Sequence, residues 1–312
     1  MATLADVARQ AGVSTATASR IINGSAKPVA DALRERVLAA VAELRYVPNA
    51  HAQMLARSHR SAVGVIVHDV SDPYFAEITR GLQRVATADN RLAIICNSFR
   101  DPERQLEYID LLHAHQVAAI VIAGSGFLDA TVSGQLDERL RAFEATGGRV
   151  AVIGRHEHTG DAVAPDNDEG GCMAGRHLIE LGHTEIGVIA GPPGLTTTAD
   201  RLAGFRRAVR KLPKNRLVHA DFTRDGGEAA AAALIAEHPE LTAIAALNDS
   251  MAVGALAAVR SSGRRIAVIG FDDMPIARDV TPALTTVRLP LTEMGERAMT
   301  LALGAPGDDP RV

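Results

Sequence analysis

Residues 12–24 read Gly-Val-Ser-Thr-Ala-Thr-Ala-Ser-Arg-Ile-Ile-Asn-Gly, and this stretch decides the fold of the first part of the chain. Ser14 is placed to cap a helix, because its side-chain oxygen can accept from backbone N–H groups of the next turn. Val13 and Ala18 can make an apolar contact across that cap, and Gly24 can end the helix in a left-handed turn. The pattern therefore predicts a short helix between Ser14 and Gly24.

This predicted helix has two different faces. Ala18, Ile21 and Ile22 recur at helical spacing, so we expect them to point inward. The opposite face carries small side chains and one arginine, namely Thr15, Ala16, Ser19, Arg20 and Asn23. A face with so few large side chains can approach another molecule closely.

The neighbouring segments predict two supporting helices. Thr3 can cap a first helix that Gly12 breaks, and its apolar positions are Leu4, Val7, Ala8 and Ala11. A third helix at about 31–45 would close a small core with Leu33, Val37, Leu38, Val41 and Leu44. Helix, glycine turn and capped helix form the helix-turn-helix arrangement, whose second helix enters the DNA major groove. A three-helix bundle that binds a protein, or nothing, is the alternative.

The charge of the chain is divided unevenly. Residues 1–60 hold eight Lys and Arg side chains against four acidic ones, a net charge of +4, whereas the remainder carries −8. A basic first part on an acidic body is expected when only the first part meets phosphate. The charge distribution therefore favours DNA binding over the protein-binding alternative.

Four spaced motifs carry a resemblance to a known family. They are Thr-Leu-Ala-Asp-Val-Ala at 3–8, Gly-Val-Ser at 12–14, Thr-Ala-Ser-Arg-Ile-Ile-Asn-Gly at 17–24 and Tyr-Val-Pro-Asn-Ala at 46–50. In this order they closely resemble the head of the lactose/galactose repressor family of bacterial transcription regulators. The resemblance continues through the body and so covers nearly the whole chain.

The resemblance implies DNA contacts at particular residues. Thr15 and Ala16 follow the capping serine and would read bases, with Arg20 as a further base contact. Ser19 and Asn23 would hold phosphate. The other positions that the resemblance assigns to DNA binding are Thr3, Ser14, Thr17 and Asn49.

Residues 48–60 join the predicted head to the body. Pro48 and Asn49 mark a helix start, but the helical stretch is shorter than the roughly 12 to 15 residues that isolated helices need in water. By resemblance this segment is the hinge helix, which orders on operator DNA and inserts a leucine, here Leu55, into the minor groove. A plain linker is the alternative interpretation.

From Ala62 the pattern changes to apolar strands that alternate with amphipathic helices, which predicts parallel sheets covered on both faces. The fold class is therefore α/β, with an all-α helix-turn-helix head at 1–47, a hinge helix or linker at 48–60 and an effector-binding and dimerisation domain at 61–312. A break near 156–160 divides this body into two subdomains. We expect the first to span about 61–158 plus 285–312, and the second about 159–284.

Polar and aromatic side chains follow several predicted strands, where ligands bind in this fold class. Asp72, Tyr74 and Phe75 follow the first strand, and aromatic faces stack well on sugar or base rings. Asp249 and Asp273 also follow strands, but Asp is a common helix cap, and we expect that role for both. By resemblance to a periplasmic-binding-protein-like effector domain, the effector pocket consists of Asp72, Tyr74, Phe75, Arg155, Arg201, Asn248 and Asp272. Of these we favour Arg201 and Asp272 most, because an arginine fork and a carboxylate suit a polyhydroxylated ligand.

Other classes of function find little support in the sequence. No nucleophile, base and orienting acid form a convincing motif, so we expect no enzyme activity and no cofactor. His156 and His158 alternate in a loop without an apparent third ligand, which argues against a metal site. The chain also lacks an apolar run long enough to span a membrane, and an apolar secretion segment. We therefore expect a cytoplasmic protein whose two cysteines, Cys96 and Cys172, are reduced.

The sequence thus predicts a ligand-responsive, sequence-specific DNA-binding transcriptional regulator, most simply a repressor. Its expected partners are double-stranded operator DNA, a small effector such as a sugar or a related metabolite, and a second copy of the chain in a homodimer. A solute-binding module without regulatory DNA binding is the alternative, since it would share the body. The basic head argues against it.

Overall fold

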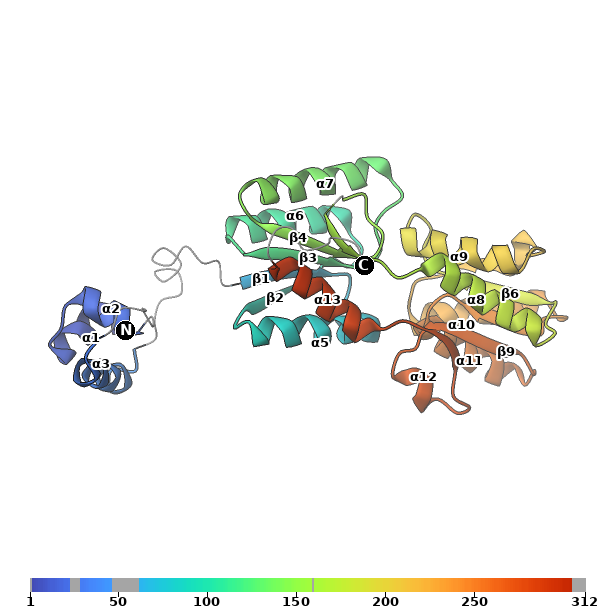
Figure 1. The fold of residues 1–312 in the computed structure, drawn as a ribbon. Coiled ribbons are helices and arrows are strands. Elements are labelled where there is room, and N and C mark those ends of the chain that lie inside the picture. The colour runs from blue at the N-terminus through green and yellow to red at the C-terminus, as the bar shows by residue number, and fades with distance from the viewer. Residues whose placement is uncertain (1, 23–28, 47–61, 159, 305–312) are drawn as a thin grey trace. The chain divides into compact units, whose positions relative to one another are not determined.

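The computed structural model describes residues 2–22, 29–46, 62–158 and 160–304, which form two compact units within 1–60 and 61–312 (Figure 1). The division falls where the sequence predicts the body to begin. The hinge at 48–60, with Asn49 and Leu55, lies outside the described residues, as do Asn23 and Gly24.

The head consists of helices α1 (Leu4–Ala11), α2 (Thr15–Ile22) and α3 (Asp31–Glu43). The predicted caps of the first two helices are confirmed. Thr3 and Asp6 form a capping box at the start of α1, and Gly12 ends that helix with a φ of 62°. The Ser14 hydroxyl accepts from the Thr17 N–H at 3.1 Å and so caps α2.

A small apolar core joins the three helices. Val7 of α1, Ala18 of α2 and Val37 of α3 are fully buried in it. Arg36 of α3 donates to the carbonyl oxygen of Ala11, which ties the third helix to the end of the first. The core therefore holds α2 against α1 and α3, and the polar face of α2 points outward.

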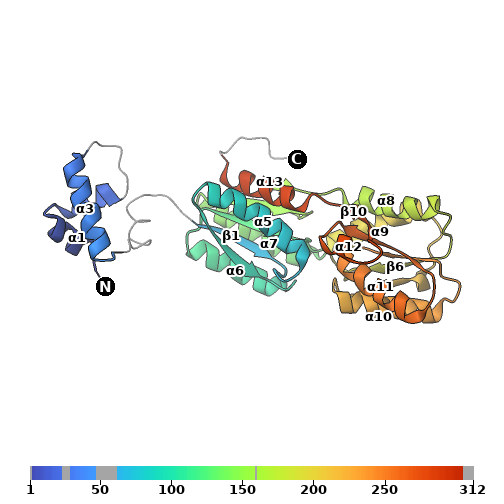
Figure 2. The same cartoon turned by 90° about the horizontal axis from the view of Figure 1, so that it is seen from below.

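The first sheet of the body is parallel, with the order β2-β1-β3-β4-β5. Its strands are β1 (Ala62–Val67), β2 (Leu92–Asn97), β3 (Ala119–Ala123), β4 (Arg149–Ile153) and β5 (Asp161–Val163). Its helices are α5 (Pro73–Ala88), α6 (Pro102–Ala114), α7 (Ala130–Ala145) and α13 (Leu291–Leu303). Helices α6 and α7 cover one face, and α5 and α13 lie side by side on the other (Figures 1 and 2). Both faces of the strands are therefore buried, as continuously apolar strands require.

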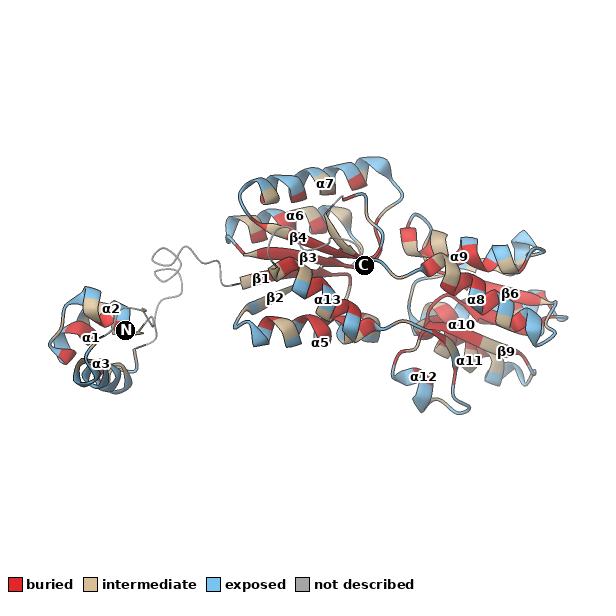
Figure 3. Ribbon diagram, viewed as in Figure 1, coloured by how far each residue is buried: buried red, intermediate tan, exposed pale blue. Residues whose placement is uncertain are grey.

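The second sheet is also parallel and has the order β10-β9-β8-β6-β7. Its strands are β6 (Ile186–Ala190), β7 (Leu217–His219), β8 (Ala243–Ala246), β9 (Ala267–Asp272) and β10 (Thr285–Arg288). Its helices are α8 (Asn167–Glu180), α9 (Thr196–Ala208), α10 (Arg224–Glu237), α11 (Asp249–Ser262) and the short α12 (Ile276–Asp279). A 3₁₀ turn at Lys214–Arg216 precedes β7. Helices α8 and α9 pack together, as do α10 and α11, and their outer faces are exposed (Figure 3).

The boundary between the two subdomains differs from the expectation at both crossings. We expected residues 285–312 to return to the first half, but β10 pairs with β9 of the second sheet, and only α13 returns to pack on α5. We also expected the second half to begin at 159, but β5 pairs with β4 of the first sheet. Strand pairing is a long-range property that the local pattern of apolar residues does not encode, which explains both errors.

Glycines bring the packed helices unusually close. A Cβ atom on Gly81 of α5 would overlap the carbonyl oxygen of Thr292 at the start of α13. On α9, a Cβ atom on Gly204 would overlap the Asp168 carbonyl of α8, and Gly227 of α10 meets α11 in the same way. These helix pairs therefore touch backbone to backbone.

Two further expectations concern membrane-spanning helices and the state of the cysteines. Within the described residues, none of the helices has the length and apolar character needed to cross a membrane. Cys96 and Cys172 are both free thiols.

Candidate functional site

The head presents the predicted reading face on α2. Thr15, Ala16 and Arg20 are exposed, whereas Thr17 and Ser19 are half-buried. Ser14 is exposed, but its hydroxyl is engaged in the cap. The residues that the sequence assigns to base reading thus lie on one accessible face of α2, with Thr15 and Ala16 in its first turn and Arg20 in its last.

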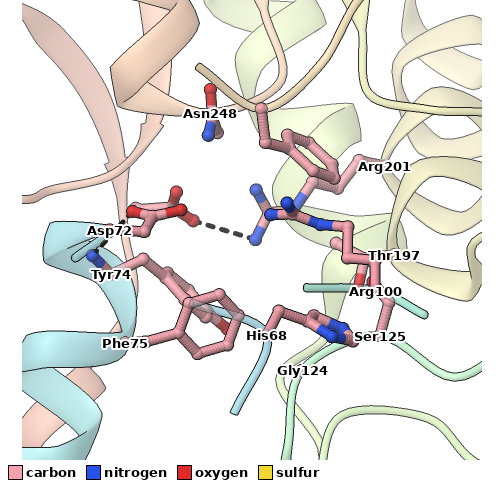
Figure 4. A pocket seen from close by; sticks show the side chains of 12 residues that line it. His68, Asp72, Tyr74, Phe75, Arg100, Gly124, Ser125, Thr197, Arg201 and Asn248 are labelled. Atoms are coloured by element: carbon pink, nitrogen blue, oxygen red, sulfur yellow. Dashed lines mark hydrogen bonds and ion pairs between the residues drawn. The ribbon is translucent and has the colours of Figure 1, made fainter. Parts of the chain in front are cut away.

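The body contains a cavity of about 390 Å³ at the carboxyl ends of the two sheets (Figure 4). The described residues that line it are His68, Asp72, Tyr74, Phe75, Arg100, Gly124, Ser125, Thr197, Arg201, Phe222, Asn248 and Asp272. The residues from His68 to Ser125 come from the first half and those from Thr197 to Asp272 from the second. The cavity is therefore a cleft between the halves, at the place where ligands bind in folds of this class.

Arg201 of α9 anchors the wall that the second half supplies. Its Nε donates to Oδ1 of Asn167 at 2.9 Å, and its Nη1 donates to the carbonyl oxygen of Leu247 at 2.6 Å. Its Nη2 pairs with Oδ1 of Asp272 at 2.9 Å, and its guanidinium carbon lies 3.8 Å from the centroid of the Phe271 ring. One buried cation thus joins three elements before any ligand is present.

The carboxylate that faces Arg201 is equally buried. The side chains of Arg201 and Asp272 are 3% and 2% exposed. Burial raises the pKa of Asp272 to about 8, and the positive charge of Arg201 opposes that shift. Oδ1 of Asp272 makes this ion pair but has no hydrogen bond of good geometry among the described residues. Burial also raises the pKa of Tyr74, and the charge of Asp272 adds to the effect.

Asp72 and Asn248 play matching parts on the two walls. Each is the N-cap of a helix: Oδ1 of Asp72 accepts from the Tyr74 N–H at 3.0 Å, and Oδ1 of Asn248 accepts from the Met251 N–H at 2.8 Å. The second oxygen of Asp72 and the amide N–H groups of Asn248 have no partner among the described residues. They can therefore bind a ligand without disturbing the caps. Burial raises the pKa of Asp72.

Aromatic rings form the rest of the first-half wall. The rings of Tyr74 and Phe75 meet edge to face, with centroids 4.9 Å apart, and Phe75 meets His68 in the same way at 5.5 Å. Burial lowers the pKa of His68 to about 3, so the imidazole is neutral at physiological pH. Its Nε2 has no hydrogen-bond partner within the described part of the chain. Figure 4 shows Tyr74 and Phe75 on one side of the cavity, with Arg201 and Asn248 on the other.

Six of the seven residues predicted for the pocket line the cavity, and Arg155 does not. The Nε and Nη2 atoms of Arg155 donate to both carboxylate oxygens of Asp200 on α9, at 2.9 and 2.7 Å. Its side chain is half exposed. The ion pair with Asp200 holds the guanidinium of Arg155 away from the cavity. The Arg155 side chain is too exposed to suggest a ligand-binding role.

The two other aspartates after strands are structural, as expected, but neither caps a helix. Asn248 caps α11, while the Asp249 carboxylate accepts from the Met274 N–H at 2.8 Å and from the Thr286 hydroxyl at 2.6 Å. Burial raises the pKa of Asp249 to about 6. Asp273 accepts from Nε of Arg288 at 2.7 Å.

Several lining residues were not found from the sequence, namely His68, Arg100, Gly124, Ser125, Thr197 and Phe222. His68 follows β1 directly, and Gly124 and Ser125 follow β3, so the strand-end rule applied to every strand would have found these three. Arg100 and Phe222 lie further along their loops, where no local pattern distinguishes them.

A helix-turn-helix head with an exposed recognition face, joined to a ligand cleft between two parallel sheets, defines a DNA-binding transcriptional regulator. Family models agree: residues 3–49 match the "Bacterial regulatory proteins, lacI family" and residues 176–312 match the "Periplasmic binding protein-like domain". The chain belongs to the lacI family of bacterial regulatory proteins.

Named relatives cover almost the whole chain. The HTH-type transcriptional regulator GalR of Salmonella typhimurium is 36% identical over 99% of this chain and 91% of its own length. The HTH-type transcriptional repressor PurR of Klebsiella pneumoniae is 35% identical over 97% of this chain and 90% of its own length. Both relatives are HTH-type transcriptional regulators, and the predicted class of protein, a DNA-binding transcriptional regulator, is confirmed.

Solved structures give the same result. The Lac repressor dimer bound to operator and the anti-inducer ONPF has a TM-score of 0.84 and 27% identity, covering 98% of this chain and 94% of that one. The transcriptional regulator CelR in complex with cellobiose has a TM-score of 0.69 and 30% identity, covering 97% of this chain and 92% of that one. The expected fold class, α/β with an all-α head, is confirmed.

Proposed function

We propose that the protein is a homodimeric, cytoplasmic repressor that binds paired operator half-sites and is controlled by a small hydroxylated ring compound in the cavity. The observation that carries this proposal is the buried Arg201–Asp272 pair, which faces an aromatic wall across the cleft between the halves. Polar groups at fixed positions in a mostly apolar cleft give a small-molecule site its specificity.

The chemistry of the cavity supports a sugar or a sugar-like compound. Asp72 supplies a carboxylate oxygen for hydroxyl groups, and Asn248 supplies an amide that both donates and accepts. Phe75 and Phe222 supply faces for a ring. Related regulators have been solved with cellobiose, with ribose and with ONPG. We extend this ligand class to the present chain.

The proposed DNA contacts follow the reading face of α2. Thr15, Ala16 and Arg20 would contact base edges, and the phosphate contacts would come from Thr3, Ser14, Thr17, Ser19, Asn23 and Asn49. Leu55 would insert between base pairs in the minor groove and kink the duplex. A homodimer would place two reading faces on the two half-sites of a palindromic operator.

The proposed control is a coupling of two equilibria. A ligand that binds one geometry of the cleft more tightly than another shifts the population of cleft geometries. Each geometry sets the spacing of the two hinge segments in a dimer, and we expect one spacing to allow both Leu55 side chains to dock. The ligand would therefore change operator affinity by its differential affinity for the two geometries.

The test begins with a metabolite screen. Thermal unfolding of the full chain would be measured with ribose, galactose, cellobiose and purine bases, and operator binding would then be titrated with and without each compound that stabilises it. We expect at least one compound to raise the midpoint and to change operator affinity at least about tenfold, within the usual range of such couplings. Stabilisation with unchanged operator affinity would instead favour the solute-binding alternative.

A variant of the recognition helix tests the DNA side. Arg20→Ala should abolish the preference for operator over scrambled DNA, because a lost base contact costs discrimination. Arg34→Ala removes an exposed arginine of α3 and is the control, which should keep that preference. Equal losses on operator and on scrambled DNA in Arg20→Ala would reject the base-reading role.

A further inference from the structure

Arg100 is the charged group of the cavity that the proposed function leaves unused. The charged side chains that line the cavity are Asp72, Arg100, Arg201 and Asp272. Arg201 and Asp272 already pair with each other. Arg100 makes no hydrogen bond or ion pair with any described residue. Its guanidinium carbon lies 5.3 Å from the centroid of the Phe222 ring, which comes from the other half of the body.

The loop after β2 holds Arg100 in place. Phe99 and Arg100 have φ values of 52° and 61°, a left-handed backbone that side chains other than glycine disfavour. The Phe99 N–H donates to the carbonyl oxygen of His68 at 2.7 Å, and Asp101 caps the next helix, α6. These bonds fix the turn on both sides of Arg100, so its position at the cavity is set by the backbone.

The surroundings of Arg100 leave its charge uncompensated at contact distance. Burial lowers the pKa of Arg100, and Asp72, Asp221 and Asp69 oppose the shift. None of these carboxylates approaches within ion-pair distance. Oδ1 of Asp69 is engaged by the N–H and the hydroxyl of Ser71, at 2.9 and 2.7 Å. A guanidinium stays charged at neutral pH, so its donors remain open to a ligand.

Asp72 and Arg100 together form an open pair of opposite charges on the first-half wall. The second oxygen of Asp72 and the donors of Arg100 both lack partners among the described residues, whereas Arg201 and Asp272 are closed on each other. A ligand that presents hydroxyl donors to Asp72 and an anionic group to Arg100 would satisfy both. A neutral sugar would bind the carboxylate of Asp72. It would leave the guanidinium of Arg100, the group of the cavity best suited to bind an anion, without one.

We propose that Arg100 binds an anionic group of the effector, so that the effector is a hydroxylated acid or a phosphorylated hydroxy compound. The inference rests on the proposed function and names the class of its ligand. The guanidinium presents two parallel N–H donors, which match two oxygens of a carboxylate or a phosphate. The ring of the ligand would then lie against the aromatic wall that Tyr74 and Phe75 form.

The first experiment uses anions alone, so that it does not depend on the stereochemistry of a sugar. Thermal unfolding of the full chain would be measured in chloride, acetate and inorganic phosphate at constant ionic strength. Acetate or phosphate should raise the midpoint of the wild type above its value in chloride. Arg100→Gln should abolish the increase, and Arg100→Lys should keep part of it. Arg104→Gln is the matched control, because Arg104 also lies over a phenyl ring, that of Phe99, but outside the cavity.

The second experiment compares one ring with different charges. Binding of galactose, galacturonate, galactose 6-phosphate and galactosamine would be measured by calorimetry. An anionic member should bind at least about tenfold more tightly than galactose, as expected for hydrogen bonds to a charged group, and Arg100→Gln should remove that advantage. The acid and the phosphate are separate arms that identify which anion the site prefers.

The outcomes are separable from those of the proposed function. No midpoint increase by acetate or phosphate, an equal increase in Arg100→Gln, or tightest binding of galactosamine would overturn the role of Arg100. The proposed function fails by a different result, in which a bound compound leaves operator affinity unchanged. Arg100→Gln should unfold in chloride at nearly the wild-type midpoint, since Arg100 makes no hydrogen bond with a described residue.

Discussion

The two walls of the cavity differ in how far their hydrogen bonds are already made. On the second-half wall, Arg201 binds Asn167, Leu247 and Asp272, so these polar groups are bonded to one another. On the first-half wall, Asp72 and Arg100 keep groups without partners among the described residues. We infer that the second-half wall is the more rigid of the two, whereas a ligand makes most of its new hydrogen bonds and ion pairs with the first-half wall.

The largest expected effect comes from removing the anchor of the rigid wall. Arg201→Met would leave Asp272 buried without its cation and Asn167 without its donor. We expect the free energy of unfolding to fall by about 1–3 kcal/mol, as for other buried polar groups that lose their hydrogen-bond partner. Urea unfolding followed by circular dichroism would measure it, with Arg100→Gln as the control on the open wall. A similar small loss in both variants would remove the distinction between the walls.

The pH dependence of stability should also come from the rigid wall. Burial raises the pKa of Asp272 from 3.8 to about 8, so between these values the folded chain holds a proton that the unfolded chain releases. The contribution of Asp272 to the free energy of unfolding should therefore fall as the pH rises through this range. Asp249, with its pKa raised to about 6, adds a decrease of the same sign at lower pH. Asp272→Asn should flatten the decrease between about pH 7 and 8, above the range in which Asp249 titrates. An unchanged slope there would contradict the assignment.

The two caps give a matched comparison of smaller size. Asp72→Ala and Asn248→Ala each remove one N-cap hydrogen bond, from α5 and α11 respectively. Each should lower the free energy of unfolding by about 1 kcal/mol. Both should weaken ligand binding, but Asp72→Ala should do so more, because the open oxygen of Asp72 belongs to a carboxyl group, whereas the open N–H groups of Asn248 belong to a neutral amide. Calorimetry with the ligand found by screening measures the second effect, and a larger loss in Asn248→Ala would reverse our ranking of the walls.

The smallest expected effect lies at the ion pair that joins the halves beside the cavity. Arg155 and Asp200 are 51% and 26% exposed, so solvent screens their attraction. A double-mutant cycle with Arg155→Ala and Asp200→Ala should give a coupling of about 1 kcal/mol or less in urea unfolding. Direct ligand contact by Arg155 would appear as a loss of affinity in Arg155→Ala that Asp200→Ala does not share.

The elements were predictable from the sequence where their signals are local. Asp72 and Pro73 mark the start of α5, since Asp72 caps the helix and Pro73 takes its first position. Ser14 and Thr3 predicted the caps of the head for the same reason. The placement of β5 and β10 was wrong, because a strand chooses its neighbour through contacts distant in sequence.

The site residues show the same difference between local signals, which the sequence contains, and contacts between residues distant in sequence. The strand-end rule and the family resemblance together led to Asp72, Arg201 and Asp272, which line the cavity because the fold brings the carboxyl ends of parallel strands together. Arg155 also follows a strand, but its partner Asp200 is 45 residues away and takes it out of the cavity. Arg100 depends on a tight turn with a left-handed backbone, for which the sequence gives no glycine as a signal.

The glycine contact between α5 and α13 has a consequence for how a signal leaves the cavity. Helix α5 begins at the ligand wall with Asp72, and further along, Gly81 rests against the backbone of α13 without intervening side chains. Because no side chains separate the two backbones at this contact, it has little room to compress, and we expect the two helices to move as one rigid body. We expect a displacement of α5 at the ligand to move α13 by the same amount. Mutations that alter the response of operator binding to the ligand, without altering ligand binding itself, should therefore cluster at the contact between α5 and α13.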